Sequence, residues 1–171
     1  FNEGKILSLI SDAGTPLLSD PGKLLVNECL ENSIKISPIP GASSITAAMS
    51  VSGFSDKFLF YGFLPKTENE LEKVLTSLSK SEFTQIFFIP SKKINFYLKA
   101  FKKFFSGRKI LIAKETTKIH ETFIRDEVEE IKLFKDPPKG ELTIIISENS
   151  TSTKIFDEKK GIDPYLEDDS T

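Results

Sequence analysis

The sequence contains few of the residues that build disulfide bonds, metal sites and membrane spans. Its 171 residues include one cysteine, Cys29, and one histidine, His120, and no tryptophan. One cysteine excludes a disulfide bond within the chain, and a lone histidine without a cysteine partner or a second histidine does not make a metal site. No apolar run approaches the ~18–20 residues of a membrane span, and no secretion signal is visible. We therefore expect a cytoplasmic protein with no metal and no membrane contact.

Charged residues are plentiful, and they are unevenly distributed. The net charge is −2, yet residues 83–114 carry eight basic residues and no acidic one. Residues 151–171 carry six acidic residues against three lysines. This last segment is rich in Ser, Thr and Asp and has no apolar periodicity, which predicts a disordered acidic tail over residues 150–171.

Short apolar runs alternate with helical patterns along the rest of the chain. Turn residues bound each run, which is typical of buried strands. We expect strands over residues 5–11, 34–39, 57–63, 84–89, 108–114 and 141–147, with a strand or turn around 121–124. Helices are expected from Asp20, as the capping residue, to about Asn32, and over residues 43–52, 68–78, 91–105 and 128–134. This alternation predicts an α/β fold with a parallel, doubly wound sheet.

Two loops of small residues follow the first two expected strands. The first reads Ser-Asp-Ala-Gly-Thr-Pro over residues 11–16, and the second reads Pro-Gly-Ala-Ser-Ser over residues 40–44. Loops at the carboxyl ends of strands in an open α/β sheet expose backbone groups at the edge where ligands bind. From the residues alone, two interpretations are equally supported: a small-molecule pocket walled by backbone, or plain strand-to-helix turns.

These loops and three further segments occur in an order that resembles a known family. The segments are SDAGTPLLSDPG at residues 11–22, PIPGASS at 38–44, GFLPK at 62–66, KETTK at 114–118 and KGELTIII at 139–146. Over roughly residues 5–147 they resemble the tetrapyrrole-methylase superfamily, and within it the ribosomal RNA small subunit methyltransferase I branch. The resemblance implies a two-lobed α/β fold, with a mostly parallel sheet in the N-terminal lobe and a mixed sheet in the C-terminal lobe. Residues 1–62 would be the remainder of the first lobe, because relatives have roughly a further third of the protein before this point, and residues 67–149 would be the second.

Members of this branch use S-adenosylmethionine to methylate the 2′-hydroxyl of a cytidine ribose in small-subunit ribosomal RNA. The resemblance therefore implies this cofactor, a partner that is small-subunit rRNA or a ribosomal particle, and a homodimer. The implied cofactor contacts are Ala13, Gly14, Thr15, Leu18, Ser43, Ser44, Ile89 and Thr116. Small residues suit the first loop because several main-chain groups can then approach the zwitterionic end of the cofactor closely.

The chain departs from its branch after residue 88. Relatives usually read F-Y-E-S-x-H-R here, whereas this chain reads FFIPSKK over residues 87–93. Ile89 thus replaces an acidic residue, and two lysines replace His-Arg. Asp12 at the first loop and Glu115 after a later strand are the carboxylate candidates for the catalytic proton acceptor.

Lysines cluster on the helix expected over residues 91–105. Its apolar residues recur at helical spacing and predict a buried stripe, so the lysines occupy the other face. A charge run is usually a solvated face, but eight basic residues without an acid favour contact with RNA phosphates. The candidate RNA contacts are Lys92, Lys93, Lys99, Lys103 and Lys118.

Two other functions remain open at this point. One is a small-molecule methylase of the same fold acting on tetrapyrroles, which the basic stretch and the SDAGTPLLSDPG form of the first loop disfavour. The other is a truncated, catalytically silent RNA-binding fragment. Cofactor calorimetry on this chain and on a version extended at the N-terminus distinguishes the leading function from such a fragment.

Removal of the acidic tail is expected to leave stability unchanged. A segment without apolar periodicity buries too little surface to offset the entropy of ordering. A chain that ends at Asn149 should therefore melt at the same temperature as the full chain in a calorimetric scan. A fall of several degrees would show that the tail packs on the body.

Overall fold

Five strands and five helical segments make up the described part of the chain, which in this computed structural model comprises residues 4–11 and 14–149. The strands are β1 (Phe58–Phe63), β2 (Thr84–Pro90), β3 (Lys109–Lys114), β4 (Thr122–Glu127) and β5 (Glu141–Ile146). The helices are α1 (Lys23–Glu31), α2 (Ser44–Ser50), α3 (Glu68–Leu78) and α4 (Ile94–Phe104), with a 3-10 turn η1 (Ser91–Lys93) before α4. None of these helices is long and apolar enough to cross a membrane.

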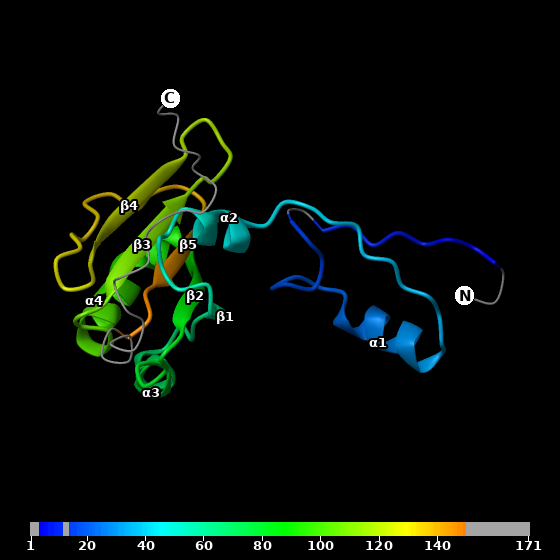
Figure 1. The fold of residues 1–171 in the computed structure, drawn as a ribbon, viewed down its shortest axis with the longest axis horizontal. Helices are drawn as coiled ribbons and strands as arrows, with labels where there is room; N and C mark the ends of the chain where they lie inside the picture. Colours follow the sequence, from blue (N-terminus) through cyan, green and yellow to red (C-terminus); the bar gives the residue numbers. More distant parts are fainter. Residues whose placement is uncertain (1–3, 12–13, 150–171) are drawn as a thin grey trace, which may run out of the picture.

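All five strands belong to one mixed sheet (Figure 1). The strand order is β1-β2-β5-β3-β4, with β1 and β2 parallel. β5 is antiparallel to both of its neighbours, and β4 is antiparallel to β3. The α/β fold class and the mixed sheet of the C-terminal part are therefore confirmed. The last strand of the described residues, β5, lies at the centre of the sheet.

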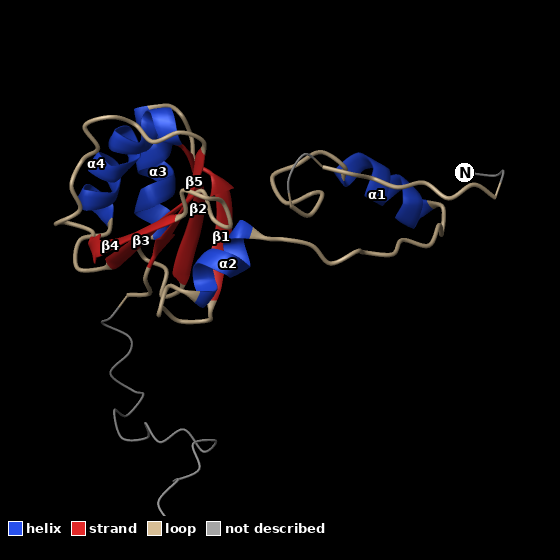
Figure 2. Cartoon of the chain, turned by 90° about the horizontal axis from the view of Figure 1, so that it is seen from above, coloured by secondary structure: helices blue, strands red, loops and turns tan. Residues whose placement is uncertain are grey.

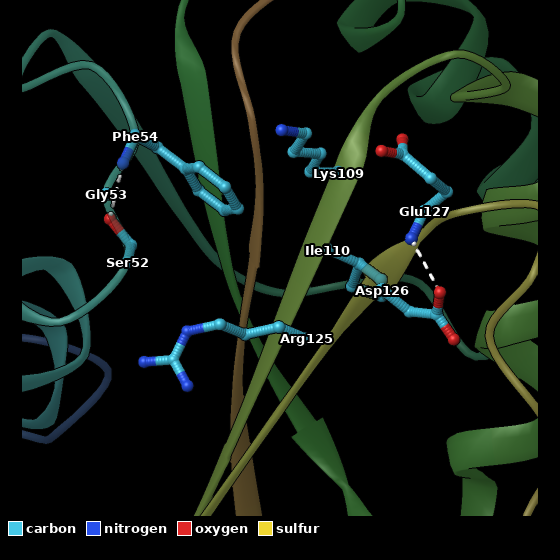
Figure 3. Close-up of a pocket in the computed structure, with 8 residues that line it drawn as sticks. All are labelled: Ser52, Gly53, Phe54, Lys109, Ile110, Arg125, Asp126 and Glu127. Atoms are coloured by element: carbon cyan, nitrogen blue, oxygen red, sulfur yellow. Dashed lines mark hydrogen bonds between the residues drawn. The ribbon is translucent and has the colours of Figure 1, made fainter.

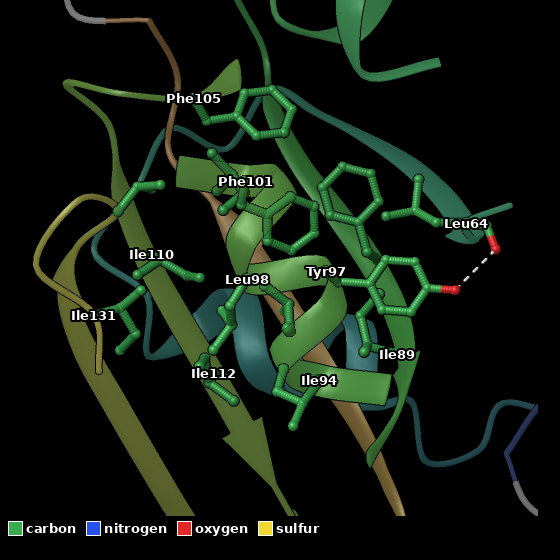
Figure 4. Packing of buried hydrophobic residues seen from close by; sticks show 14 of the residues in the cluster. Leu64, Ile89, Ile94, Tyr97, Leu98, Phe101, Phe105, Ile110, Ile112 and Ile131 are labelled. Carbon is green, nitrogen blue, oxygen red and sulfur yellow. Dashed lines mark hydrogen bonds between the residues drawn. The ribbon is translucent and has the colours of Figure 1, made fainter. Parts of the chain in front are cut away.

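Helices α3 and α4 cover one face of the sheet (Figure 2). Figure 4 shows side chains of α4 in the core beneath them. The buried stripe predicted for the lysine-bearing helix is confirmed, since Ile94, Leu98, Phe101 and Phe105 are all at most 1% exposed. The ring of Phe101 stacks on that of Phe87 in β2, with centroids 5.4 Å apart. Tyr97 lies in the same core, where burial raises the pKa of its hydroxyl. That hydroxyl donates to the carbonyl of Pro65 at 3.2 Å and so ties α4 to the segment after β1.

Helix α2 covers part of the opposite face (Figure 2). Ile45 and Ala48 of α2 pack against a second apolar cluster formed by Ile86, Leu111, Ala113 and Ile145. Alternate residues of β5 thus face the two sides, with Ile145 towards α2 and its neighbours Ile144 and Ile146 towards α4. The two faces of β5 are both buried, which explains its continuous apolar run.

Residues 4–11 and 14–42 lie beside the sheet and not within it (Figures 1 and 2). The strands expected over residues 5–11 and 34–39 are not formed, so that prediction is wrong for this structure. Neither segment joins the described sheet, and Ile6, Ile10 and Ile39 are 96%, 85% and 85% exposed. An apolar run becomes a strand only where a neighbour supplies hydrogen bonds and a covered face. The parallel N-terminal sheet is accordingly absent from the described part of the chain.

The first helix begins later than expected. Its N-cap is Gly22, with a φ of 134° and no side-chain cap, so Asp20 is not the capping residue. The chain first turns through Leu17 and Ser19, whose φ angles are 76° and 66°. This turn places Asp20 before the point where the chain enters the helix, out of reach of the first-turn N–H groups that a cap must bind.

The helix expected over residues 128–134 is not formed either. The N–H of Val128 donates to the carbonyl of Arg108 and so extends the pairing of β3 with β4. The N–H of Ile131 completes a single helical turn to Glu127, but that of Phe134 donates to the side chain of Asn95 on α4. Tertiary partners therefore take the donors that a helix would have used, and the prediction from apolar spacing is wrong here.

Two expectations about chain organisation remain predictions. One is the division into lobes near residues 62–67. β1 ends within this range and pairs with β2, so it belongs to the same sheet as the later strands. The disordered tail expected over residues 150–171 lies outside the described residues.

Truncation of Phe101 should destabilise the fold strongly. Phe101 is fully buried between α4 and β2, so Phe101→Ala leaves a cavity and is expected to lower the free energy of unfolding by about 3–5 kcal/mol. Phe58→Ala is the matched control, because Phe58 is 42% exposed at the start of β1 and should cost far less. Urea denaturation measures both, and equal losses would contradict this description of the core.

Candidate functional site

The two loops of small residues come together in the structure. A Cβ atom on Gly14 would lie 3.5 Å from the carbonyl oxygen of Ala42, and one on Gly41 would lie 4.0 Å from Oγ1 of Thr15. Gly14 has a φ of 79°, a conformation that glycine adopts at little cost. The loops therefore adjoin even though the strands expected before them are absent.

Ser43 connects the second loop to α2. Its side chain accepts a 3.5 Å hydrogen bond from the N–H of Thr46, and its extended backbone is that of an N-cap. Ser44 is the first residue of the helix. The capping role of the first serine is thus confirmed, and both serines lie at the end of a helix that is anchored on the sheet through Ile45 and Ala48.

The turn after the first loop reaches the sheet. Leu18 is half exposed in this turn. A Cβ atom on Gly62, near the end of β1, would lie 3.2 Å from Oγ of Ser19. The catalytic candidate Asp12 and the predicted cofactor contact Ala13 lie outside the described residues, so the structure places neither of them.

The remaining predicted cofactor contacts lie at one edge of the sheet. Ile89 in β2 pairs with Leu142 in β5, which pairs with Lys114 in β3, so β2 and β3 end at the same edge with β5 between them. Thr116 follows β3 at this edge and is partly exposed. Ile89 is fully buried in the core under α4, so the structure exposes no part of this residue to a ligand.

Glu115 begins a loop with a defined backbone conformation. Glu115 and Thr117 have φ angles of 48° and 67°, which side-chain-bearing residues adopt at a cost. Within the loop, the N–H of Lys118 donates to the carbonyl of Glu115, and that of Thr117 donates to the carboxylate of Glu121. Glu115 is partly exposed and Lys118 is exposed. The loop therefore holds a carboxylate and an ammonium group at the sheet edge that also carries Thr116.

The predicted basic surface is present on the outer side of η1 and α4. Lys92, Lys93, Lys99 and Lys103 are exposed there. Lys103 forms a 2.5 Å ion pair with Glu72 of α3, and the ammonium group of Lys102 donates to the carbonyl of Glu129 at 2.8 Å. Glu72 thus compensates part of the charge that the sequence places in this stretch.

Arg108 does not belong to this surface, although it contributes to the basic stretch in the sequence. It is 3% exposed, and its guanidinium donates to the carbonyls of Ser79 and Ser81 at 2.6 and 2.9 Å. Burial lowers the pKa of this guanidinium, and the nearby carboxylate of Glu148 opposes that shift. Arg108 therefore ties the segment after α3 to the start of β3 and has a structural role.

A cavity of about 430 Å³ lies at the start of β3, beside the segment that follows α2 (Figure 3). Its lining includes Phe54, Lys109 and Arg125, and the guanidinium of Arg125 donates to the carbonyl of Val51 at 2.6 Å. None of the predicted site residues lines it. A second, more open cavity lies along α3 and likewise contains none of them. Within the described residues, no group of three or more His, Cys, Asp or Glu side chains is placed to hold a metal ion.

The sequence matches a known protein family and several curated proteins. Residues 1–132 match the family Tetrapyrrole (Corrin/Porphyrin) Methylases. Several curated relatives are named ribosomal RNA small subunit methyltransferase I. The protein from Thermotoga maritima is 40% identical over 150 residues, which is 86% of this chain and 67% of the relative. That from Rickettsia prowazekii is 40% identical and covers 96% of this chain and 59% of the relative.

The Bacillus subtilis protein of the same name is 32% identical and covers 94% of this chain and 56% of the relative. The chain thus spans between about half and two thirds of the length of the curated relatives it matches.

Solved structures with the same fold are also found. The methyltransferase CobJ has a TM-score of 0.59 at 18% identity, over 79% of this chain and 62% of that chain. Uroporphyrin-III C-methyl transferase from Thermus thermophilus, complexed with S-adenyl homocysteine, has a TM-score of 0.52 at 15% identity, over 79% of this chain and 63% of that chain. At these identities the likeness shows the fold.

Proposed function

This chain belongs to the tetrapyrrole (corrin/porphyrin) methylase family, and on that premise we propose that the protein is an S-adenosylmethionine-dependent methyltransferase acting on the 2′-hydroxyl of a cytidine ribose in small-subunit ribosomal RNA. One observation carries the proposal: most of the chain aligns with relatives that bear the name of an rRNA methyltransferase. The solved structures with tetrapyrrole names are far less similar in sequence and support the fold alone.

The adjoining loops suit the proposed cofactor. Gly14 lacks the Cβ atom that would approach the carbonyl of Ala42, so main-chain groups are accessible on both sides of the contact. Ser43 and Ser44 add hydroxyl and N–H groups at the start of α2. We assign the cofactor to Ala13, Gly14, Thr15, Leu18, Ser43, Ser44 and Thr116. Ile89, the remaining contact that the resemblance implies, is fully buried in this structure.

Methyl transfer to a ribose hydroxyl requires alignment of the reacting atoms and a proton acceptor. S-adenosylmethionine, when bound, supplies a methyl group on a sulfonium leaving group. The loops then have to hold the ribose oxygen in line with the methyl carbon and the sulfur, which is a contribution of position and orientation. A ribose hydroxyl is a weak nucleophile, so a carboxylate that accepts its proton is expected to help by about 10²–10⁴-fold. Glu115 and Asp12 are the candidates, and Glu115 lies at the sheet edge beside Thr116.

The basic surface supports an RNA substrate over a small molecule. Lys92, Lys93 and Lys99 are exposed and can meet phosphates without breaking a packed contact. Such contacts add affinity that depends on salt and not on sequence. Lys118 stands apart from these lysines, on the loop with Glu115, where it would meet the RNA close to the reacting ribose. We further propose that the protein works as a cytoplasmic homodimer on rRNA or on the ribosomal particle.

Replacement of Gly14 by valine tests the cofactor site. Gly14→Val in the full-length protein should abolish binding of S-adenosylhomocysteine in calorimetry, because the new side chain occupies the space against Ala42. Gly107→Val is the matched control: its φ of 78° imposes a similar backbone strain, but a Cβ there meets nothing within 4 Å. Normal binding by Gly14→Val would place the cofactor elsewhere.

Removal of lysines tests the RNA surface. The variant replaces four exposed lysines by serine: Lys92, Lys93, Lys99 and Lys103. Filter binding to small-subunit particles at several salt concentrations should show weaker affinity. The slope of the logarithm of affinity against the logarithm of salt concentration should also become shallower by roughly one unit per lost phosphate contact. We expect about three units, because Lys103 is already paired with Glu72. Cofactor affinity should stay unchanged, since the buried face of α4 is untouched.

The matched control removes the same charge elsewhere, at Lys57, Lys80, Lys132 and Lys135, all of which are exposed. If this slope changes equally in both variants, or in neither, the surface of α4 is an ordinary solvated face and not an RNA-binding surface.

A further inference from the structure

A β-bulge at Gly62 changes the face of the sheet on which the last side chains of β1 lie. Phe60 pairs with Ile86 and Gly62 pairs with Phe87, so Tyr61 is an extra residue without a partner. Gly62 has a φ of 82°, as is usual where glycine forms a bulge. In a regular strand, residues three apart lie on opposite faces. The extra residue instead brings Phe60 and Phe63 onto the same face.

Phe60, Phe63 and Phe88 form an aromatic trio on that face. The centroid of the Phe88 ring lies 5.0 Å from that of Phe60 and 5.6 Å from that of Phe63, and both pairs meet edge to face. Phe60 and Phe88 are partly buried against the cluster under α2. Phe63 is 43% exposed. The two inner rings therefore fix the outer one, while much of its surface remains open.

The trio lies beside the proposed cofactor loops. Phe63 and Phe88 pair near the carboxyl ends of the parallel strands β1 and β2, the edge at which ligands bind in α/β sheets. A Cβ atom on Gly62 would lie 3.2 Å from Oγ of Ser19 and 3.7 Å from the ring of Phe60. The turn that follows the first loop therefore contacts the bulge that creates the trio.

We propose that the aromatic trio is a platform on which a nucleobase stacks. The inference rests on the proposed function, which brings two bases to this edge: the adenine of the cofactor and the base of the RNA nucleotide whose ribose is methylated. Every nucleobase has a π-face, and aromatic side chains hold such faces without reading sequence. A bulge next to a ligand site commonly re-aims a side chain towards it, and here it re-aims the ring with the greatest exposure of the three.

The test removes the ring of Phe63 and keeps a matched ring elsewhere on the same strand. The variants of the full-length protein are Phe63→Ala, the conservative Phe63→Tyr, and Phe58→Ala. Phe58 is a suitable control because it is 42% exposed at the opposite end of β1. Affinity for S-adenosylhomocysteine is measured by calorimetry and affinity for small-subunit particles by filter binding at one salt concentration. Thermal melting of all variants is recorded alongside.

Phe63→Ala should weaken the affinity for one of the two ligands by about 5- to 100-fold. Phe63→Tyr should restore that affinity, and Phe58→Ala should bind both ligands as the wild type does. Loss of S-adenosylhomocysteine identifies the stacked base as adenine, and loss of the particle alone identifies it as the substrate base. Unchanged affinity for both ligands, or an equal loss in Phe58→Ala, would overturn the proposal and leave the trio as a packing cluster. A wild type that bound neither ligand would refute the proposed function, and the platform with it.

Discussion

The pairing of β5 between β2 and β3 is the interaction on which the rest of the structure depends. Ile144, Ile145 and Ile146 of this strand are fully buried, and they face alternately the cluster under α4 and the cluster under α2. Without β5, the helices on both faces would lose the central strand against which they pack. The parallel pair of β1 and β2 would also be separated from β3 and β4. Because β5 is also the last strand in the described part of the chain, its pairing with β2 and β3 joins segments that are distant in sequence.

The same pairing fixes the edge at which the proposed chemistry takes place. β5 holds the ends of β2 and β3 in one row, through Ile89, Leu142 and Lys114, and so sets where the loop carrying Glu115 and Thr116 emerges. The two loops of small residues approach from the N-terminal side, and their contact with the sheet runs through the bulge at Gly62. Parts that are distant in sequence therefore converge through backbone geometry, with few side chains involved.

The sequence predicted best what depends on local pattern. The bounds of α3 agree with the prediction, and the buried stripe of α4 was evident from the spacing of its apolar residues. Predictions failed where a partner decides the outcome. Residues 5–11 and 34–39 have the pattern of strands but belong to no sheet in the described part of the chain, and Asn95 takes a donor that the helix expected near Phe134 needed.

Among the candidate site residues, the contact between the two loops was foreseeable from their motifs. The buried state of Arg108 and of the Ile89 side chain was not, because charge and position alone do not reveal what packs above a residue. The aromatic trio had one signal in the sequence, an isolated glycine within a strand pattern, which indicates a bulge. The most direct test of the central claim is transfer of a labelled methyl group from S-adenosylmethionine by the full-length protein, offered small-subunit ribosomal particles and, separately, a tetrapyrrole. We expect label in the rRNA, in a nucleotide whose 2′-O-methylated ribose resists alkaline cleavage; label in the tetrapyrrole, or on an RNA base, would refute the proposed function.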